Sequence, residues 1–136
     1  MSLLREELKD VAGNDWRYQL VDAQINLVQG DTATAKQTLV SLNQKYPLNV
    51  EVLKTLGAFY RTFEMDFDGF YLFYNVTQVN TRNSDLWYDL AYFAARLGQA
   101  EDAGFCALKA IEFQLDEQRK IEIGEEFSDF IDAYSE

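Results

Sequence analysis

The sequence predicts an all-α protein built from pairs of helices that recur every 34 residues. One observation is a stripe of apolar residues on a single side of a helix, formed by Trp87, Leu90, Ala91 and Ala94. Another is a ladder of small residues at a constant step of 34, formed by Ala35, Gly69 and Ala103. A fixed period of this length is typical of arrays in which each helix pair stacks on the next.

This period divides the chain into three helix pairs, at residues 16–49, 50–83 and 84–117. Before them, residues 3–13 carry apolar positions on one side and predict a short N-terminal helix. After them, residues 118–136 predict one capping helix, whose apolar side is formed by Ile123, Phe127, Phe130, Ile131 and Tyr134. Its apolar side would cover the end of the array, which otherwise exposes an apolar face, and its polar side would face solvent. We expect one domain over residues 1–136.

Helix starts and stops fit these pairs. Asp15, Asn49 and Ser84 precede apolar patterns and are the expected N-caps. Gly30 follows the first helix of its pair and predicts a turn. Pro47 cannot continue a helix and predicts its end.

The second unit resembles the tetratricopeptide repeat (TPR) family. That family's pattern combines a Leu-Gly pair, a Tyr, a small residue and an aromatic residue at fixed steps. Residues that match it are Leu53, Leu56, Gly57, Tyr60, Gly69 and Phe73. The third unit matches at Trp87, Leu90 and Ala91, and the first unit matches least. The resemblance implies a right-handed superhelix (an α-solenoid) of three repeats that binds other proteins.

Composition narrows the classes of partner. The net charge is −11, and an acidic surface disfavours both nucleic acid and anionic membranes. No segment has the length and apolarity of a spanning helix or the layout of a signal peptide. Cys106 is the single cysteine, so no internal disulfide forms. We therefore expect a cytoplasmic protein whose partner is another protein or a peptide.

The sequence favours no catalytic, cofactor or metal site. It contains no histidine, which removes the commonest general base and most zinc sites. The run from Glu64 to Gly69 resembles the start of a calcium loop, but Asn75 stands where such a loop would end in Glu. Asn75 also begins a formal glycosylation sequence ending at Thr77, but we expect no glycosylation because the sequence shows no signal-peptide pattern. We expect a protein that is not an enzyme and needs no cofactor.

The TPR resemblance implies that the first helix of each pair lines a concave groove. The residues expected to project into it are Gln24, Lys54, Ala58, Arg61, Tyr88, Tyr92 and Arg96. A basic, tyrosine-rich groove in an acidic shell would suit a peptide with acidic and apolar side chains. Alternatively, Arg61 and Arg96 pair with nearby acids. Ala58 and Tyr92 stand where the family's carboxylate clamp would use Asn, so we expect no such clamp.

A second candidate surface lies in the run 70–74, which holds five large residues. They cannot all face one side of a helix. We expect Tyr71, Leu72 and Tyr74 to point to the convex surface and form a contact patch. Alternatively, the tyrosine rings lie flat with their hydroxyls in water.

Three functions compete. The first is an adaptor whose groove holds a partner peptide or helix. The second is a chaperone for a secreted or translocator protein, because small acidic three-repeat proteins resemble the TPR chaperones of bacterial type III secretion. Such a protein would aggregate or form a homodimer when alone. In the third, the chain is a fragment of a longer TPR scaffold in an envelope or polysaccharide-assembly protein.

Overall fold

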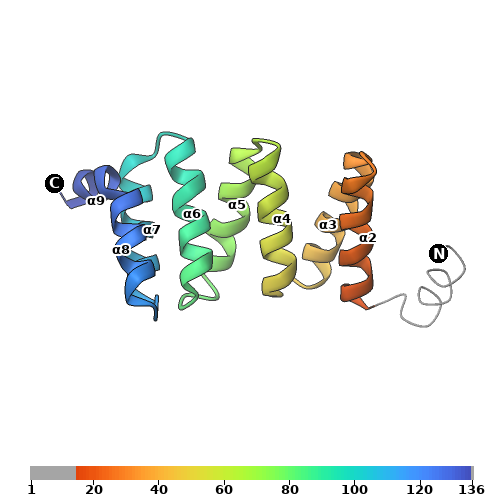
Figure 1. Ribbon diagram of the computed structural model, residues 1–136, viewed down its shortest axis with the longest axis horizontal. Helices are drawn as coiled ribbons and strands as arrows, with labels where there is room; N and C mark the ends of the chain where they lie inside the picture. Colours follow the sequence, from red (N-terminus) through yellow and green to blue (C-terminus); the bar gives the residue numbers. More distant parts are fainter. Residues whose placement is uncertain (1–14, 136) are drawn as a thin grey trace, which may run out of the picture. The chain divides into compact units, whose positions relative to one another are not determined.

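The computed structural model describes residues 15–135, and the predicted N-terminal helix at 3–13 lies outside them. The described residues form helices and no strands, in the order α2 (Trp16–Val28), α3 (Thr32–Lys45), α4 (Val50–Thr62), α5 (Asp66–Thr77), α6 (Ser84–Arg96), α7 (Ala100–Glu112), α8 (Glu117–Glu126) and α9 (Ser128–Ser135) (Figure 1). The chain divides into two compact units, Met1–Phe59 and Tyr60–Glu136. None of the described helices has the length and apolarity that a membrane span requires.

In the N-terminal unit, α2 and α3 pack against each other as an antiparallel pair. Their buried residues repeat at helical spacing and are Leu20, Ala23, Ala35, Leu39 and Leu42. The Asp15 side chain accepts a hydrogen bond from the Arg17 N–H at 2.8 Å, which confirms Asp15 as an N-cap. Asn49 likewise accepts from the Val52 N–H at the start of α4. The helix pair of the first repeat therefore forms as its sequence predicts.

Each turn inside a helix pair contains one residue with a positive φ. These are Gly30 at 83°, Glu64 at 54° and Gly98 at 76°. Glycine adopts this conformation without steric cost, whereas a residue with a Cβ is strained in it. Glu64 therefore departs from the pattern of the other two turns, 34 residues away on either side.

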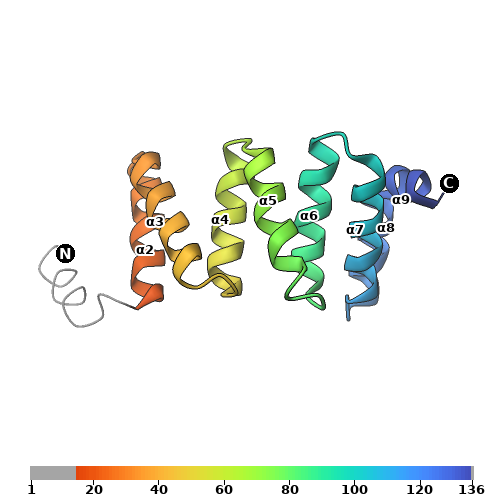
Figure 2. The ribbon, with the colours of Figure 1, turned by 180° about the vertical axis from the view of Figure 1, so that it is seen from behind.

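The C-terminal unit contains the last residues of α4 and the helices α5 to α9. Within it, α6 and α8 lie toward the viewer in Figure 1, and α5 and α7 lie toward the viewer in Figure 2. The small residue of α5 explains the close packing of α5 on α6, because a Cβ on Gly69 would overlap the Phe93 ring. Beside it, the rings of Phe73 and Phe93 stack at 6.0 Å between centroids. Gly69, Phe73 and Val76 are buried, as the repeat pattern predicts.

The start of α6 differs from the prediction. Asn83, not Ser84, is the N-cap, and its side chain accepts from the N–H groups of Asp85 and Leu86. Ser84 is the first helical residue instead. Its hydroxyl donates to the Ala110 carbonyl at 2.7 Å and thereby joins α6 to the end of α7.

The predicted capping helix at 118–136 is two helices. The α8 helix ends before Phe127, and α9 runs at a large angle to it (Figure 1). Phe127 is buried, with 3% of its surface exposed. Gly104 of α7 lies directly under the backbone of Phe130, so α9 approaches α7 more closely than any residue with a Cβ would permit. The break therefore allows one segment to cover both α6 and α7.

Candidate functional site

The residues predicted to line a groove fall in both units. Gln24, Lys54 and Ala58 belong to the N-terminal unit, and all three are exposed. The C-terminal unit contains Arg61, Tyr88, Tyr92 and Arg96. Tyr88, Tyr92 and Arg96 lie on one side of α6, because successive members are four residues apart.

Arg61 is held by two partners from α6. Its Nη2 lies 2.9 Å from Oδ1 of Asp89. Its guanidinium lies over the Tyr92 ring, 4.1 Å from the centroid. A planar cation is attracted to the negative face of an aromatic ring. The Arg61 and Tyr92 side chains are therefore held together on the surface.

Arg96 is bound by two carboxylates. Its Nε lies 3.4 Å from Oδ2 of Asp66, and its Nη2 lies 3.6 Å from Oε1 of Glu64. The hydrogen bond to Asp66, together with that residue's charge, raises the pKa of Arg96 above its ordinary value. The strained residue of the α4–α5 turn is thus also a partner of this arginine.

Tyr88 connects α6 to the C-terminal helices. Its hydroxyl donates to the Glu126 carboxylate, whose oxygens lie at 2.8 and 2.9 Å. The Arg119 guanidinium lies 4.7 Å from the centre of the Tyr88 ring. Burial raises the pKa of Tyr88, and its hydrogen bond to Glu126 raises it further. Edge-on packing against Phe127 at 5.6 Å completes its surroundings.

These contacts settle the choice that the sequence left open for the arginines. Arg61 and Arg96 both pair with acids of the same unit. Each of these charges is therefore offset in part by a carboxylate, as in the alternative considered from the sequence.

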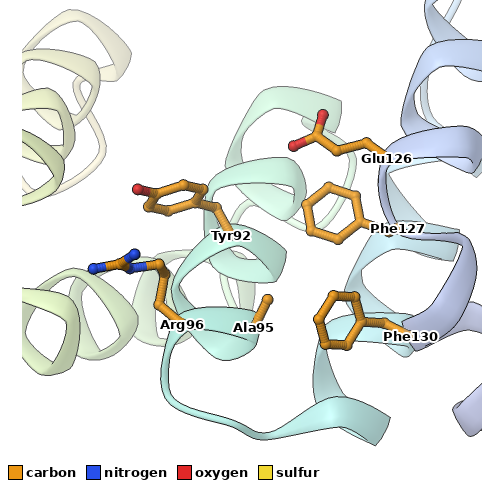
Figure 3. A pocket seen from close by; sticks show the side chains of 6 residues that line it. All are labelled: Tyr92, Ala95, Arg96, Glu126, Phe127 and Phe130. Atoms are coloured by element: carbon orange, nitrogen blue, oxygen red, sulfur yellow. The ribbon is translucent and has the colours of Figure 1, made fainter.

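A pocket of about 410 Å³ lies between α6 and the two C-terminal helices. Its lining consists of Tyr92, Ala95, Arg96, Glu126, Phe127 and Phe130 (Figure 3). The two phenylalanine rings point toward α6, whereas the Tyr92 ring points away from them, to the side on which Arg96 lies (Figure 3). The pocket is open to solvent, and its lining combines aromatic rings with two charged side chains.

Sequence reasoning placed only part of this pocket. The sequence predicts that Tyr92 and Arg96 project into a groove from the first helix of the third repeat. Phe127 and Phe130 were assigned to the core side of one continuous helix instead. The helix breaks at Phe127. Glu126 and Phe130 therefore belong to different helices, yet both line this pocket. The apolar spacing carries no signal for that break.

The expected convex patch is partly exposed. Tyr71 and Tyr74 expose 59% and 49% of their surface, whereas Leu72 is less exposed and is half-buried. Phe67, which the sequence did not single out, exposes 65%. Phe67, Tyr71 and Tyr74 are spaced by four and three residues, so they follow one stripe of α5.

The remaining sequence motifs have structural roles. Asp66 begins α5 and binds Arg96. The Thr77 hydroxyl is buried and donates to the Phe73 carbonyl at 2.8 Å. Cys106 is buried, and this burial raises the pKa of its thiol to about 12. Within residues 15–135, no group of three His, Cys, Asp or Glu side chains is placed to hold a metal ion.

No protein-family model and no curated protein matches the sequence. Solved structures of MamA, a TPR-repeat protein, are similar to this chain. One has a TM-score of 0.68 and 17% identity, over 90% of this chain and 71% of that one. Another has a TM-score of 0.68 and 14% identity, over 96% of this chain and 81% of that one. A structure of MamA AMB-1 has a TM-score of 0.66 and 19% identity, over 96% and 74% of the two chains.

Similarity at such low identity concerns the fold alone. It agrees with the helix pairs, the small residues at their crossings and the turns described above. The chain therefore has the all-α TPR fold that its sequence predicts.

Proposed function

We propose that the chain is a non-enzymatic module that binds a partner polypeptide at the pocket between α6, α8 and α9. The observation that carries this proposal is a partly open apolar pocket lined by three aromatic rings, Tyr92, Phe127 and Phe130. Aromatic residues in a concave site supply most of the binding energy in many protein interfaces. The TPR fold, in which helices rather than loops line the binding surface, supports the same reading.

The pocket is also rigidly supported, which lowers the entropic cost of binding. Tyr92 is fixed by the guanidinium of Arg61, and Phe127 by the ring of Tyr88. Arg61 is itself bound to Asp89. A partner side chain would therefore enter a site whose walls are already in place.

Capture from extract of the native cell tests this proposal when it is compared between variants. Tyr92→Ala and Phe130→Ala each remove a lining ring and should abolish capture of the partner while the circular dichroism stays helical. Tyr71→Ala is the matched control, because it removes an exposed tyrosine of α5 that does not line the pocket. Capture that survives both Tyr92→Ala and Phe130→Ala would contradict the assignment of the pocket.

A second candidate function is a chaperone that shelters an apolar client on α5. The exposed stripe of Phe67, Tyr71 and Tyr74 favours it, because adjacent exposed aromatic rings often mark a protein contact. In that case Tyr71→Ala, and not Tyr92→Ala, should lose the client. The protein should also keep that client soluble at equimolar ratio, which light scattering measures.

A further inference from the structure

The two charged residues of the pocket are placed very differently. The Arg96 side chain extends away from Phe127 and Phe130, whereas Glu126 stands beside the Phe127 ring (Figure 3). Arg96 is already bound by Asp66 and Glu64. Arg61 and Arg119 also lie against rings at this site, and each pairs with a carboxylate of its own, Asp89 and Glu122. Three cations thus stand against five carboxylates around the pocket, and the local charge is negative.

Glu126 retains capacity for a cation. Its carboxylate accepts from the Tyr88 hydroxyl, and no Lys or Arg among residues 15–135 forms an ion pair with it. The nearby Arg119 pairs with Glu122 instead, at 3.4 Å. A carboxylate has about four acceptor positions, so one hydroxyl donor leaves Glu126 free to accept further hydrogen bonds.

We infer that the pocket binds a lysine or arginine side chain of the partner polypeptide. The aliphatic stem would lie along Phe130 and Ala95, and the charged head would donate to Glu126. Long cationic side chains bury their methylene groups on apolar surface and keep the head polar. Aromatic rings beside the head add a cation–π attraction, and the net charge of −11 would attract a basic segment from a distance. This inference rests on the proposed function.

The test begins with selection from a displayed library of random twelve-residue peptides. The immobilised protein is the full chain, and Ala95→Leu serves as counter-selection because it fills the pocket with a side chain that suits a helix. The enriched peptide is then synthesised with a fluorophore, in its own form and with its Lys or Arg replaced by Gln. Fluorescence anisotropy measures the affinity of each form.

Glu126 variants give the decisive comparison. Glu126→Gln keeps an acceptor for Tyr88 and should weaken the basic peptide about tenfold, and Glu126→Lys should weaken it further. Glu125→Lys is the matched control, because it is exposed on the same helix and changes the net charge equally without lining the pocket. It should weaken binding less than about threefold.

The outcomes separate the inference of a Lys or Arg ligand from the proposed function of the pocket. Enriched peptides that contain Lys or Arg, and that lose affinity with Glu126→Gln, support the inference. Peptides that depend on an open pocket but carry apolar or acidic anchors, or ignore Glu126→Lys, overturn it and leave the proposed function intact. If Ala95→Leu selects the same peptides, or if no peptide is enriched, both the inference and the proposed function fail.

Discussion

Replacing Gly104 with alanine should destabilise the C-terminal unit, although alanine is the better helix former. Gly104 lies in α7, beneath the point where α9 crosses it. A Cβ there would stand 2.7 Å from the carbonyl carbon of Phe130 and 2.8 Å from the Cβ of Tyr134. Backbone atoms cannot rotate away as the end of a side chain can, so α9 would have to move.

Two opposing terms set the size of the effect. The exchange of glycine for alanine inside a helix stabilises it by about 1 kcal/mol. Overpacking in a well-packed core costs about 1–3 kcal/mol, and the upper half of that range applies because the obstacle is backbone. The free energy of unfolding should therefore fall by about 1–2 kcal/mol.

Urea denaturation followed by far-UV circular dichroism measures this change. Gly124→Ala is the matched control, because its Cβ would meet only the Ile111 side chain, at 3.9 Å. That variant should gain up to about 1 kcal/mol. If Gly104→Ala stabilises the protein as much as Gly124→Ala does, then α9 does not pack on the backbone of α7.

Three further predictions concern single side chains. Glu64→Gly should raise the free energy of unfolding by about 0.5–1 kcal/mol in urea, because relief of the positive φ outweighs an exposed ion pair; a lower urea midpoint would contradict this. Ser84→Ala should lower it by about 1 kcal/mol, because the Ala110 carbonyl loses its donor; an unchanged urea midpoint would show that the bond contributes nothing. Cys106 should react with iodoacetamide at neutral pH only after denaturation, because burial keeps its thiol protonated. Mass spectrometry measures the labelling, and rapid labelling of the native protein would refute the packing of Cys106.

Much of the fold could be predicted because its signals are local. The turn at Gly30 and the caps at Asp15 and Asn49 each depend on a few neighbouring residues, and all three are present. The buried side of α5 follows from helical spacing alone. Where two adjacent residues could both cap a helix, as at Asn83 and Ser84, spacing does not decide between them, and the structure has Asn83 in place of the predicted Ser84.

The candidate site was harder to predict because it depends on contacts between helices. Arg61 and Asp89 are 28 residues apart, and only the directions of their side chains decide whether they meet. The break at Phe127 has no glycine or proline beside it, and the apolar spacing continues through it. What separates α8 from α9 is packing, with Phe127 buried and Gly104 admitting the backbone of Phe130.

The departures from regularity converge on the same part of the C-terminal unit. Two turns use glycine at the position of positive φ, whereas the turn before α5 uses Glu64, whose carboxylate binds Arg96. Arg96 lines one side of the pocket, and the residues around the helix break at Phe127 line the opposite side. Stable folds usually keep local preference and global structure in agreement, and violations tend to collect at functional sites. A strained residue and an unexpected break at one pocket are therefore two structural reasons, independent of its aromatic lining, to seek the function there.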